Sequence, residues 1–284
     1  EKDGIQSMNG AVIDIKNFDE LKIKSNEQGI NSEYGDLSIT GKNIDVDAAE
    51  QGIRSLLGGN IELNTESTAI KAGLEAIKAT GRSSVEINST TTQLTGDIVL
   101  LKYDGVEPNV KVNFGDSKSF LKGKVTTSDN GRNELTFSNS ASWDVTGDSN
   151  VSELKVDGGI IDLNNTVTVG TLAGSDMTVN ATSFDNAIVT DDNRVANVTI
   201  NASAAMTDAL AKGEASTEDA LNVVTRNNSG SVTFYGAASD VAGATTITSD
   251  ANGNVTRTEA TNTANAAVSD MSSISMMTWR QENN

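Results

Sequence analysis

A four-residue pattern of apolar, polar, apolar and asparagine residues recurs along the chain and constrains its fold more than any other feature. The first copy begins at Ile61, the next 24 residues later at Val85, and the third 25 residues later at Val110. The copies read IELN, VEIN, VKVN, IDLN, MTVN and VTIN, at 61–64, 85–88, 110–113, 161–164, 177–180 and 198–201. Self-similarity with a period of about 20–50 residues is typical of proteins built from stacked repeats.

A second repeat in the N-terminal part has nearly the same period. The segment EQGINS at 27–32 returns as EQGIRS at 50–55, which is 23 residues later. Alternating segments precede the two copies: LKIK at 21–24 and IDVD at 44–47. STAIKA at 67–72 is interpreted as a looser third copy. The repeating unit is therefore a strand, a short polar bend, Gly-Ile and a second short strand.

The alternation within each copy predicts which side chains are buried. Because side chains alternate between the two faces of a strand, Ile61 and Leu63 share one face and Glu62 lies on the other. One such strand cannot bury its apolar face, but stacked copies form a continuous core. We therefore predict an all-β, right-handed parallel β-helix over residues 1–202, with about nine rungs that each rise ~4.8 Å. The residues expected inside are Ile61, Leu63, Val85, Ile87, Val110 and Val112.

The asparagine that ends each copy has two expected roles. Asparagine tolerates the left-handed backbone region, which the corner of a rung requires. Stacked asparagine side chains also form hydrogen-bonded ladders between neighbouring strands. We therefore expect these asparagines to turn the corners and to connect the rungs.

The sequence changes character after the last copy of the pattern. The segment SAAMTDALAKGEASTEDALNVV is alanine-rich and predicts two short helices. Gly213 is suited to end the first helix, and Ser216 with Asp219 resembles a capping pair for the second. SVTFYG predicts a strand, and TTITSDANGNVTRTE predicts a hairpin that turns at Asn252-Gly253.

These patterns divide the chain into three parts. The β-helix takes residues 1–202, a small mixed cap takes residues 203–262, and a C-terminal linker helix takes residues 263–284. The helix is predicted from residues at helical spacing along one stripe, which consists of Val268, Met271, Ile274 and Thr278. No run of about twenty apolar residues occurs, so the sequence predicts no membrane-spanning helix.

Composition excludes several classes of function. The formal net charge is −18, and an acidic surface repels phosphate backbones, so we expect no nucleic-acid partner. The chain has no cysteine, which excludes a disulfide scaffold, a thiolate zinc site and a cysteine nucleophile. It has no histidine, which excludes a Ser-His-Asp triad and histidine metal ligands. We predict a protein that is not an enzyme and that has no cofactor and no metal site.

Carboxylate chemistry on a polysaccharide is the enzymatic alternative that remains. The candidate pairs are Asp45 with Asp47 and Asp191 with Asp192. Glycosidases place two carboxyl groups on either side of the bond that they cleave. Asp45 and Asp47 instead alternate with apolar residues, which puts both on one solvated strand face. We expect Asp191 and Asp192 in a polar turn, and we interpret both pairs as surface charge.

Oxygen-rich turns and aromatic side chains offer further candidate sites. DANGN at 250–254 and DNGRNE at 129–134 carry oxygen atoms suited to calcium, but neither completes a calcium-binding loop. Asn-Gly is typical of tight hairpins, so we interpret both segments as turns. Tyr34, Tyr103 and Trp143 have the chemistry to stack on sugars. Trp143 follows the repeat pattern, however, and is expected in the core or at a rung edge.

The segment SASWDVTGDSNVSELKVDGGIIDL, residues 140–163, resembles passenger domains of Gram-negative autotransporters of the pertactin and AIDA type. Those passengers carry rungs of the form S-x-W-x-V-T-G-x-S-x-V-x-x-L-x-V-x-G-G-x-I-x-L. Ser142 departs slightly in offset, and the residues that match are Trp143, Val145, Gly147, Ser149, Val151, Leu154, Val156, Gly158 and Gly159. The tail SMMTWRQENN, residues 275–284, resembles the linker helix that enters the translocator barrel in the same families.

The resemblance implies a β-helix that is exported by type V secretion to the cell surface or beyond it. It implies that residues of about 165–262 help to nucleate folding outside the cell. It also implies a downstream β-barrel of the same protein, absent from this segment, that would tether the passenger to the Gram-negative outer membrane.

A processing site is a further implication of the resemblance. In serine-protease autotransporters, a Glu-x-Asn-Asn sequence in the linker helix is cut between its two asparagines. Gln281, Glu282, Asn283 and Asn284 give a similar sequence in which the acidic residue is shifted by one. Asn283 and Asn284 are therefore a candidate processing site, and the alternative is that the segment merely ends there.

We interpret the chain as a surface-exposed passenger that acts as an adhesin or autoaggregation module. The long flat faces of a solenoid suit many weak contacts. The expected partners are glycans or proteins of host or bacterial surfaces, other copies of this chain, and the β-barrel of the full-length protein. Two alternatives remain: a structural stalk that presents a more N-terminal domain, and a polysaccharide-acting enzyme that uses carboxylates.

Overall fold

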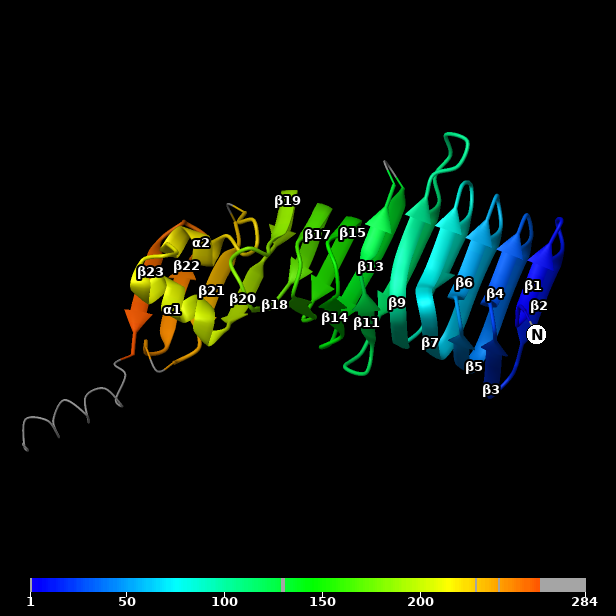
Figure 1. The fold of residues 1–284 in the computed structure, drawn as a ribbon, viewed down its shortest axis with the longest axis horizontal. Coiled ribbons are helices and arrows are strands. Elements are labelled where there is room, and N and C mark those ends of the chain that lie inside the picture. Colours follow the sequence, from blue (N-terminus) through cyan, green and yellow to red (C-terminus); the bar gives the residue numbers. More distant parts are fainter. Residues whose placement is uncertain (1, 129–130, 228, 240, 261–284) are drawn as a thin grey trace, which may run out of the picture.

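The chain folds into a β-solenoid of about 9 turns, in which strands make up 63% of the structure and helices are few. The computed structural model describes residues 2–128, 131–227, 229–239 and 241–260. Figure 1 shows the turns stacked side by side along the long axis of the rod. The predicted fold class, an all-β solenoid, is confirmed.

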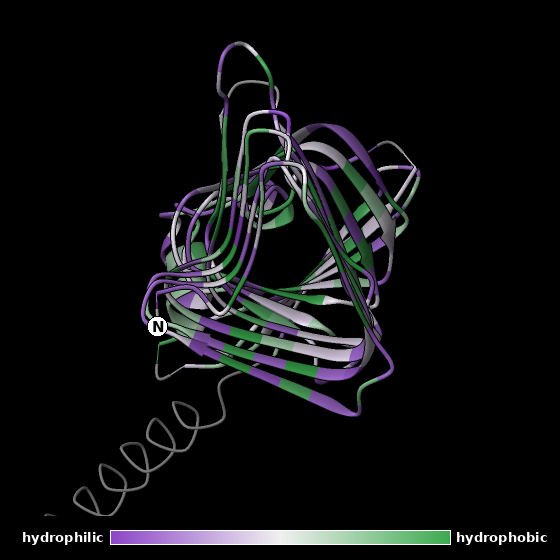
Figure 2. Cartoon of the chain, turned by 90° about the vertical axis from the view of Figure 1, so that its right-hand side faces the viewer, coloured by the Kyte–Doolittle hydropathy of each residue, from purple (hydrophilic) through white to green (hydrophobic). Residues whose placement is uncertain are grey.

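Each turn contributes strands to three faces, and Figure 2 shows these faces in a view down the long axis of the rod. The first face consists of β2 (Val12–Lys16), β8 (Ser84–Ile87), β10 (Asn109–Phe114), β13 (Arg132–Ser138), the first parts of β5 (Asp36–Ala48) and β7 (Asn60–Thr80), and the last parts of β15 (Ser149–Asp157), β17 (Val167–Ser175) and β19 (Ile188–Val195). The second face consists of β3 (Glu20–Ser25), β11 (Phe120–Gly123), β14 (Ser142–Val145), β16 (Ile160–Leu163), β18 (Met177–Ala181), β20 (Asn197–Ala202), later parts of β5 and β7, and the first part of β9 (Thr91–Leu101). The third face consists of β1 (Ile5–Met8), β4 (Gln28–Glu33), β6 (Gln51–Leu56), β12 (Val125–Thr127) and the remaining parts of β7, β9, β15, β17 and β19.

Inward side chains of successive turns stack directly on one another. Ile39, Leu63 and Ile87 are register partners in parallel strands of the first face, and each is 0% exposed. All the residues predicted to lie inside are at most 1% exposed. The period-two alternation therefore predicted the buried face of these strands correctly.

A stack of aromatic rings fills the core near the middle of the rod. The ring centroids of Phe114 and Phe137 lie 4.4 Å apart, and those of Phe137 and Trp143 lie 6.0 Å apart. The Trp143 side chain is fully buried, and its Nε1 donates to the carbonyl oxygen of Gly123 at 2.9 Å. This hydrogen bond satisfies the single polar atom of the indole. Trp143 is thus a core residue, as its place in the repeat predicts.

The repeated EQG-Ile segments and the alternating segments before them are register partners, as the sequence predicts. The assignment of the third copy to residues 67–72 is wrong, because residues 51–56 lie on residues 75–80 instead. A Cβ atom at Gly52 would lie 2.1 Å from a core side chain, which explains the glycine. The next turn, whose pairing is irregular there, carries Ala76 at this position. The repeat is therefore hidden in the sequence of that turn.

The asparagines of the four-residue pattern form ladders but do not turn the corners. The Asn88 Nδ2 donates to Asn64 Oδ1 at 3.2 Å, and Asn201 donates to Asn180 at 3.1 Å, which confirms the ladder. The expected left-handed backbone at these positions is wrong, since within the described ranges none of them has a positive φ. The residues with a positive φ, glycine aside, are Asn9, Asn17, Tyr34, Leu57, Asp104, Asn139, Ser140 and Asp176. Asn64, Asn113, Asn180 and Asn201 still belong to the strands, and Asn88 and Asn164 directly follow them.

The C-terminal part contains the two short helices that the sequence predicts. Helix α1 (Ala204–Lys212) ends at Gly213, which has a φ of 75°, and α2 (Thr217–Leu221) begins with a capping box formed by Ser216 and Asp219. Strand β21 (Ser231–Gly236) adds to β20 in parallel. Strands β22 (Thr245–Ser249) and β23 (Val255–Glu259) then pair antiparallel, and the predicted hairpin is confirmed. Among the described residues, no helix is long and apolar enough to cross a membrane.

The expected linker helix at 263–284 lies outside the described residues, as does the candidate processing site at Asn283 and Asn284. Both stay predictions from the sequence.

Candidate binding surface

Outward side chains of neighbouring turns form long rows on the surface of the rod. On the first face, the row that we call the carboxylate row consists of Asp14, Ser38, Glu62, Glu86, Lys111, Glu134 and Glu153. Cations pair with most of its carboxylates. Lys16 Nζ lies 2.6 Å from Asp14 Oδ2, Lys111 Nζ lies 3.7 Å from Glu86 Oε1, and Arg132 Nη2 lies 2.6 Å from Glu134 Oε1 and 3.8 Å from Glu153 Oε2. This row therefore presents carboxylates that are mostly ion-paired.

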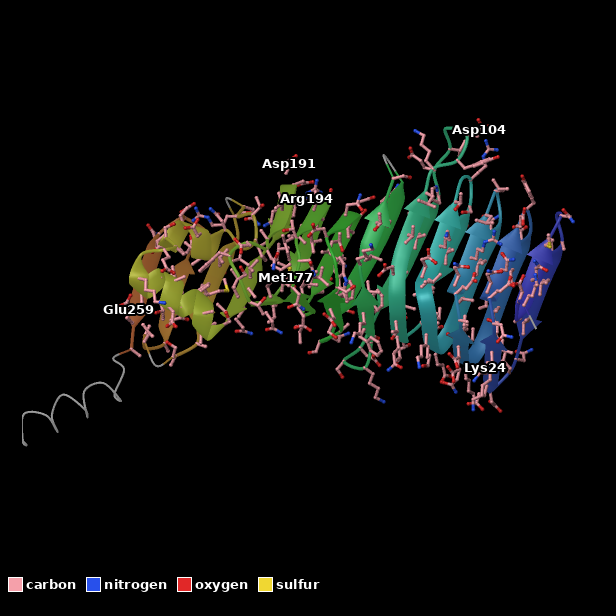
Figure 3. The ribbon with its side chains drawn as sticks, in the orientation of Figure 1. Lys24, Asp104, Met177, Asp191, Arg194 and Glu259 are labelled. Atoms are coloured by element: carbon pink, nitrogen blue, oxygen red, sulfur yellow. The ribbon has the colours of Figure 1, made fainter. Side chains whose placement is uncertain are left out.

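The corresponding row on the second face carries both signs of charge. We call it the mixed row, and it consists of Lys24, Asp47, Lys71, Thr95, Lys122, Asp144, Asp162, Asn180 and Asn201. Lys24 Nζ lies 3.6 Å from Asp47 Oδ2, and Asn180 Nδ2 donates to Asp162 Oδ1 at 2.7 Å. In Figure 3, Lys24 lies on the side of the rod away from Asp104. The row changes from alternating charges at one end to amides at the other.

Asp45 and Asp47 lie on the outer surface of β5, as expected for two residues on one solvated strand face. Both are exposed. Asp47 forms the ion pair with Lys24, and Asp45 is the register partner of Lys22. Because they point outward from one strand, these carboxylates do not face each other across a bond to be cleaved.

Asp191 and Asp192 lie within β19, so the expectation of a polar turn is wrong. Arg194 Nε and Nη2 donate to Asp192 Oδ1 and Oδ2 at 2.8 Å and 2.5 Å. These hydrogen bonds from Arg194, and one from Thr171 Oγ1, hold the pKa of the Asp192 carboxyl below its ordinary value. An ionised carboxylate has no proton to give, so Asp192 is unsuited to act as a general acid. Figure 3 shows Asp191 and Arg194 at the outer edge of the rod.

The oxygen atoms of the 250–254 segment are used by the turn itself. Asp250 Oδ1 accepts from the backbone N–H of Asn252 at 2.8 Å and of Asn254 at 2.9 Å, and Asp250 Oδ2 accepts from Asn254 Nδ2 at 2.7 Å. Across the part of the chain that the structure describes, no group of three or more Asp or Glu residues is arranged to hold a metal ion. The 129–134 segment lies partly outside the described residues.

The three aromatic candidates separate into one buried and two exposed side chains. Trp143 lies in the core, whereas Tyr34 and Tyr103 are 53% and 57% exposed. Although 69 positions apart in the sequence, these two tyrosines line one shallow cleft together with Arg82. Arg82 is not among the candidates that the sequence offered. The 23- to 24-residue period would have placed it one position after a rung corner, two turns from the corner at Tyr34.

Comparison with known proteins gives a partial similarity. No family model matches the chain. No solved structure matches it significantly. The chain is 30% identical over 157 residues to an immunoglobulin A1 protease autotransporter of Haemophilus influenzae strain Rd, and equally to one from Haemophilus influenzae without a named strain. The match covers 49% of this chain but 9% of either relative, so the chain spans only a small part of their length.

The solenoid does not indicate a catalytic site. The candidate carboxylates are exposed, ion-paired or engaged in turns. What the surface offers instead is long rows of regularly spaced polar side chains and one cleft lined by aromatic residues.

Proposed function

Because the β-solenoid and the similarity to an autotransporter fit an autotransporter passenger domain, we propose that the chain is an adhesive segment of a surface-exposed passenger. The observation that carries the proposal is the register of the exposed rows. Polar side chains of successive turns lie in register every ~4.8 Å along the rod, because the turns stack with parallel strands. A tether to the outer membrane through a C-terminal β-barrel is part of the proposal and rests on the similarity.

Repetition turns weak contacts into stable attachment. A single exposed ion pair contributes only ~0–1 kcal/mol, so the pair between Lys24 and Asp47 leaves both side chains available to a partner. Once one site has bound, its neighbours bind at a high effective concentration. The alternation of Lys24, Asp47 and Lys71 is also complementary to itself when a second copy is shifted by one turn. The mixed row therefore suits both surface glycans or proteins and self-association.

The test is adhesion of beads that carry the purified chain to epithelial cells, to extracellular matrix and to one another. One variant reverses three charges on the second face: Lys24→Glu, Lys71→Glu and Lys122→Glu. The matched control makes the same change in net charge on the first face: Lys16→Glu, Lys111→Glu and Lys155→Glu. We expect adhesion to fall at least tenfold in the first variant and by less than twofold in the second.

The bead assay also separates adhesion from the stalk alternative. A rod that binds no cell, no matrix component and no second copy supports the interpretation as a structural stalk. Equal effects of the two triple variants contradict the assignment of adhesion to the mixed row.

A protease function is not proposed for this segment. Immunoglobulin A1 protease is part of the name of the relatives, of which the chain matches 9%. The chain contains no histidine, so it holds no Ser-His-Asp triad. We expect no labelling of the purified chain by a serine-directed covalent probe, and labelling would contradict this view.

A further inference from the structure

We infer that the cleft shared by Tyr34 and Tyr103 binds one neutral hexopyranose ring of a surface glycan. The inference rests on the proposed function, because it names the ligand class of the adhesive segment. The cleft has a volume of about 200 Å³. Its lining consists of Tyr34, Leu57, Arg82, Tyr103, Asp104 and Val106.

The cleft forms where the corners of successive turns stack. The backbone N–H of Leu57 donates to the carbonyl oxygen of Thr80 at 3.0 Å, and the N–H of Gly81 donates to that of Leu101 at 3.0 Å. Tyr34 occupies the equivalent corner one turn before Leu57. Gly81 has no side chain, and a Cβ there would lie 3.2 Å from the Cβ of Tyr103. This glycine therefore leaves the space into which Tyr103 fits.

A tight hairpin closes one side of the cleft. The backbone N–H groups of Tyr103 and Val106 each donate to the other residue's carbonyl oxygen at 3.0 Å. The chain reverses at Asp104 and Gly105, which have φ values of 49° and 74°. Figure 3 shows Asp104 in a loop that stands away from the rod. The hairpin holds Tyr103 and Asp104 beside the Gly81 corner, two turns from the corner at Tyr34.

The backbone at this place is strained, and burial of the strained tyrosine does little to offset the cost. Tyr34 and Leu57 have φ values of 55° and 52°, a region that bulky side chains rarely adopt. Such a conformation costs ~1–3 kcal/mol and is concentrated at binding and catalytic sites. Tyr34 recovers little of this cost by burial, since half of its side chain is exposed. Asparagine and glycine occupy other corners of this edge, at Asn9 and Gly81, where they fit the same backbone.

The polar groups around the aromatic floor are free to bind a ligand. Within the described residues, the side chains of Arg82 and Asp104 form no hydrogen bond and no ion pair, and neither do the hydroxyls of Tyr34 and Tyr103. A guanidinium only donates and a carboxylate only accepts, whereas sugar hydroxyls do both. The aromatic rings match the apolar C–H face of a pyranose. Together these groups match one face and one edge of a sugar.

Charge and size define the sugar further. Arg82 and Asp104 balance each other, and the net charge of −18 disfavours an anionic sugar. The cleft is smaller than the ~300–1,000 Å³ of pockets for drug-sized ligands, so it accommodates one ring. The affinity of one ring is expected near a Kd of ~1 mM, which is useful only in a multivalent rod.

The experiment is saturation-transfer NMR on the chain of residues 1–284 with methyl glucoside, methyl galactoside, methyl mannoside and N-acetylglucosamine as probes. We expect at least one probe to bind, and Tyr103→Ala or Arg82→Ala to weaken it at least tenfold. Arg82 is exposed and unpaired within the described residues, so its replacement leaves the fold intact. The matched control is Tyr235→Ala, which removes a 50% exposed tyrosine from β21, several turns away.

Three results overturn the inference: no neutral probe binds, sialyllactose binds while the neutral probes do not, or both cleft variants bind as tightly as the native chain. The bead assay keeps this test separate from the proposed function. If adhesion is unchanged in Tyr103→Ala and Arg82→Ala, the inference about the cleft is contradicted and the proposed adhesive function stands. If the chain binds hexosides but adheres to no cell, matrix component or second copy, the proposed adhesive function is contradicted and the inference about the cleft stands.

Discussion

Replacing Leu63 by Asp tests the buried face of the solenoid. Leu63 is 0% exposed and lies between Ile39 and Ile87 of the neighbouring turns. Loss of the buried leucine costs ~1.5–3 kcal/mol. A buried carboxyl stays neutral, with a pKa raised by up to ~3–5 units. At ~1.4 kcal/mol per unit, keeping this carboxyl neutral at pH 7, which is ~3 units above its ordinary pKa, adds ~4 kcal/mol. The sum of ~5–7 kcal/mol is comparable to the whole stability of many domains, ~5–15 kcal/mol.

The matched control is Glu62→Lys, at the neighbouring and exposed position. Its register partners on the carboxylate row are Ser38 and Glu86, so the change removes a like-charge contact and loses one hydrogen bond from Asn64 Nδ2. We expect a change in unfolding free energy within ~0.5 kcal/mol, as for most surface substitutions.

Urea titration followed by circular dichroism is the assay, because the midpoint reports stability when the slope is unchanged. The Leu63→Asp chain is expected to lose cooperative unfolding at pH 7 and to recover part of it near pH 4. The sign follows from linkage: the pKa of the new carboxyl is raised in the folded state, so its penalty grows as pH rises above the unfolded value. Equal midpoints for the two variants would refute the assigned faces.

Three further predictions follow from single contacts. Trp143→Ala should lower the free energy of unfolding by ~3–5 kcal/mol, because it removes a buried ring and the hydrogen bond to Gly123. The loss is read as a lower urea midpoint, and a loss below ~1 kcal/mol would contradict the aromatic core. Hydrogen bonds from Ser216 hold the pKa of Asp219 below its ordinary value of 3.8, so this carboxylate stabilises α2 above that value and the contribution disappears as pH falls through the lowered pKa. The protection of α2 against hydrogen exchange, taken relative to the intrinsic exchange rate at each pH, should therefore fall at low pH in the native chain and much less in Asp219→Ala, and parallel protection profiles would contradict the cap. In the full-length protein, Asn283→Ala should abolish cleavage of the linker. If the surface protein is intact both in the native form and in the Asn283→Ala variant, self-cleavage at this site is contradicted.

The β-solenoid was predictable because its signal is periodic. Alternation within a strand identifies the inward side chains, and the near-constant spacing of Ile61, Val85 and Val110 identifies the stack. Short helices with their caps were predictable for a different reason. The capping groups of Ser216 and Asp219 act within one turn of helix, so the local sequence contains the whole interaction.

Features that depend on stacking between turns were not predictable in the same way. The corners fall on Tyr34 and Leu57 rather than on the pattern asparagines, because the position of a corner follows from the neighbouring turns. Asp192 was expected in a turn because its segment is polar. It lies in a strand, where Arg194 and Thr171 of the preceding turn donate hydrogen bonds to its carboxylate.

The cleft could be predicted only in part. The two tyrosines were recognised as candidates for sugar stacking, but their proximity depends on a hairpin and on three stacked corners. Residues of several turns form such a site, so no local sequence motif predicts it. Only an alignment of the turns by their repeat period brings the corner residues of the cleft together.

Distances between pairs of spin labels along the carboxylate row test the central claim most directly, because the adhesive surface exists only if the turns stack in register. The native chain has no cysteine, so each label attaches at one introduced residue. Paired with Asp14→Cys, the substitutions Glu134→Cys, Glu153→Cys and Thr171→Cys lie five, six and seven turns away. In a stacked rod these distances are about 24, 29 and 34 Å, because each turn adds ~4.8 Å. Distances that do not increase from pair to pair would contradict the stacked rod and the rows that it presents.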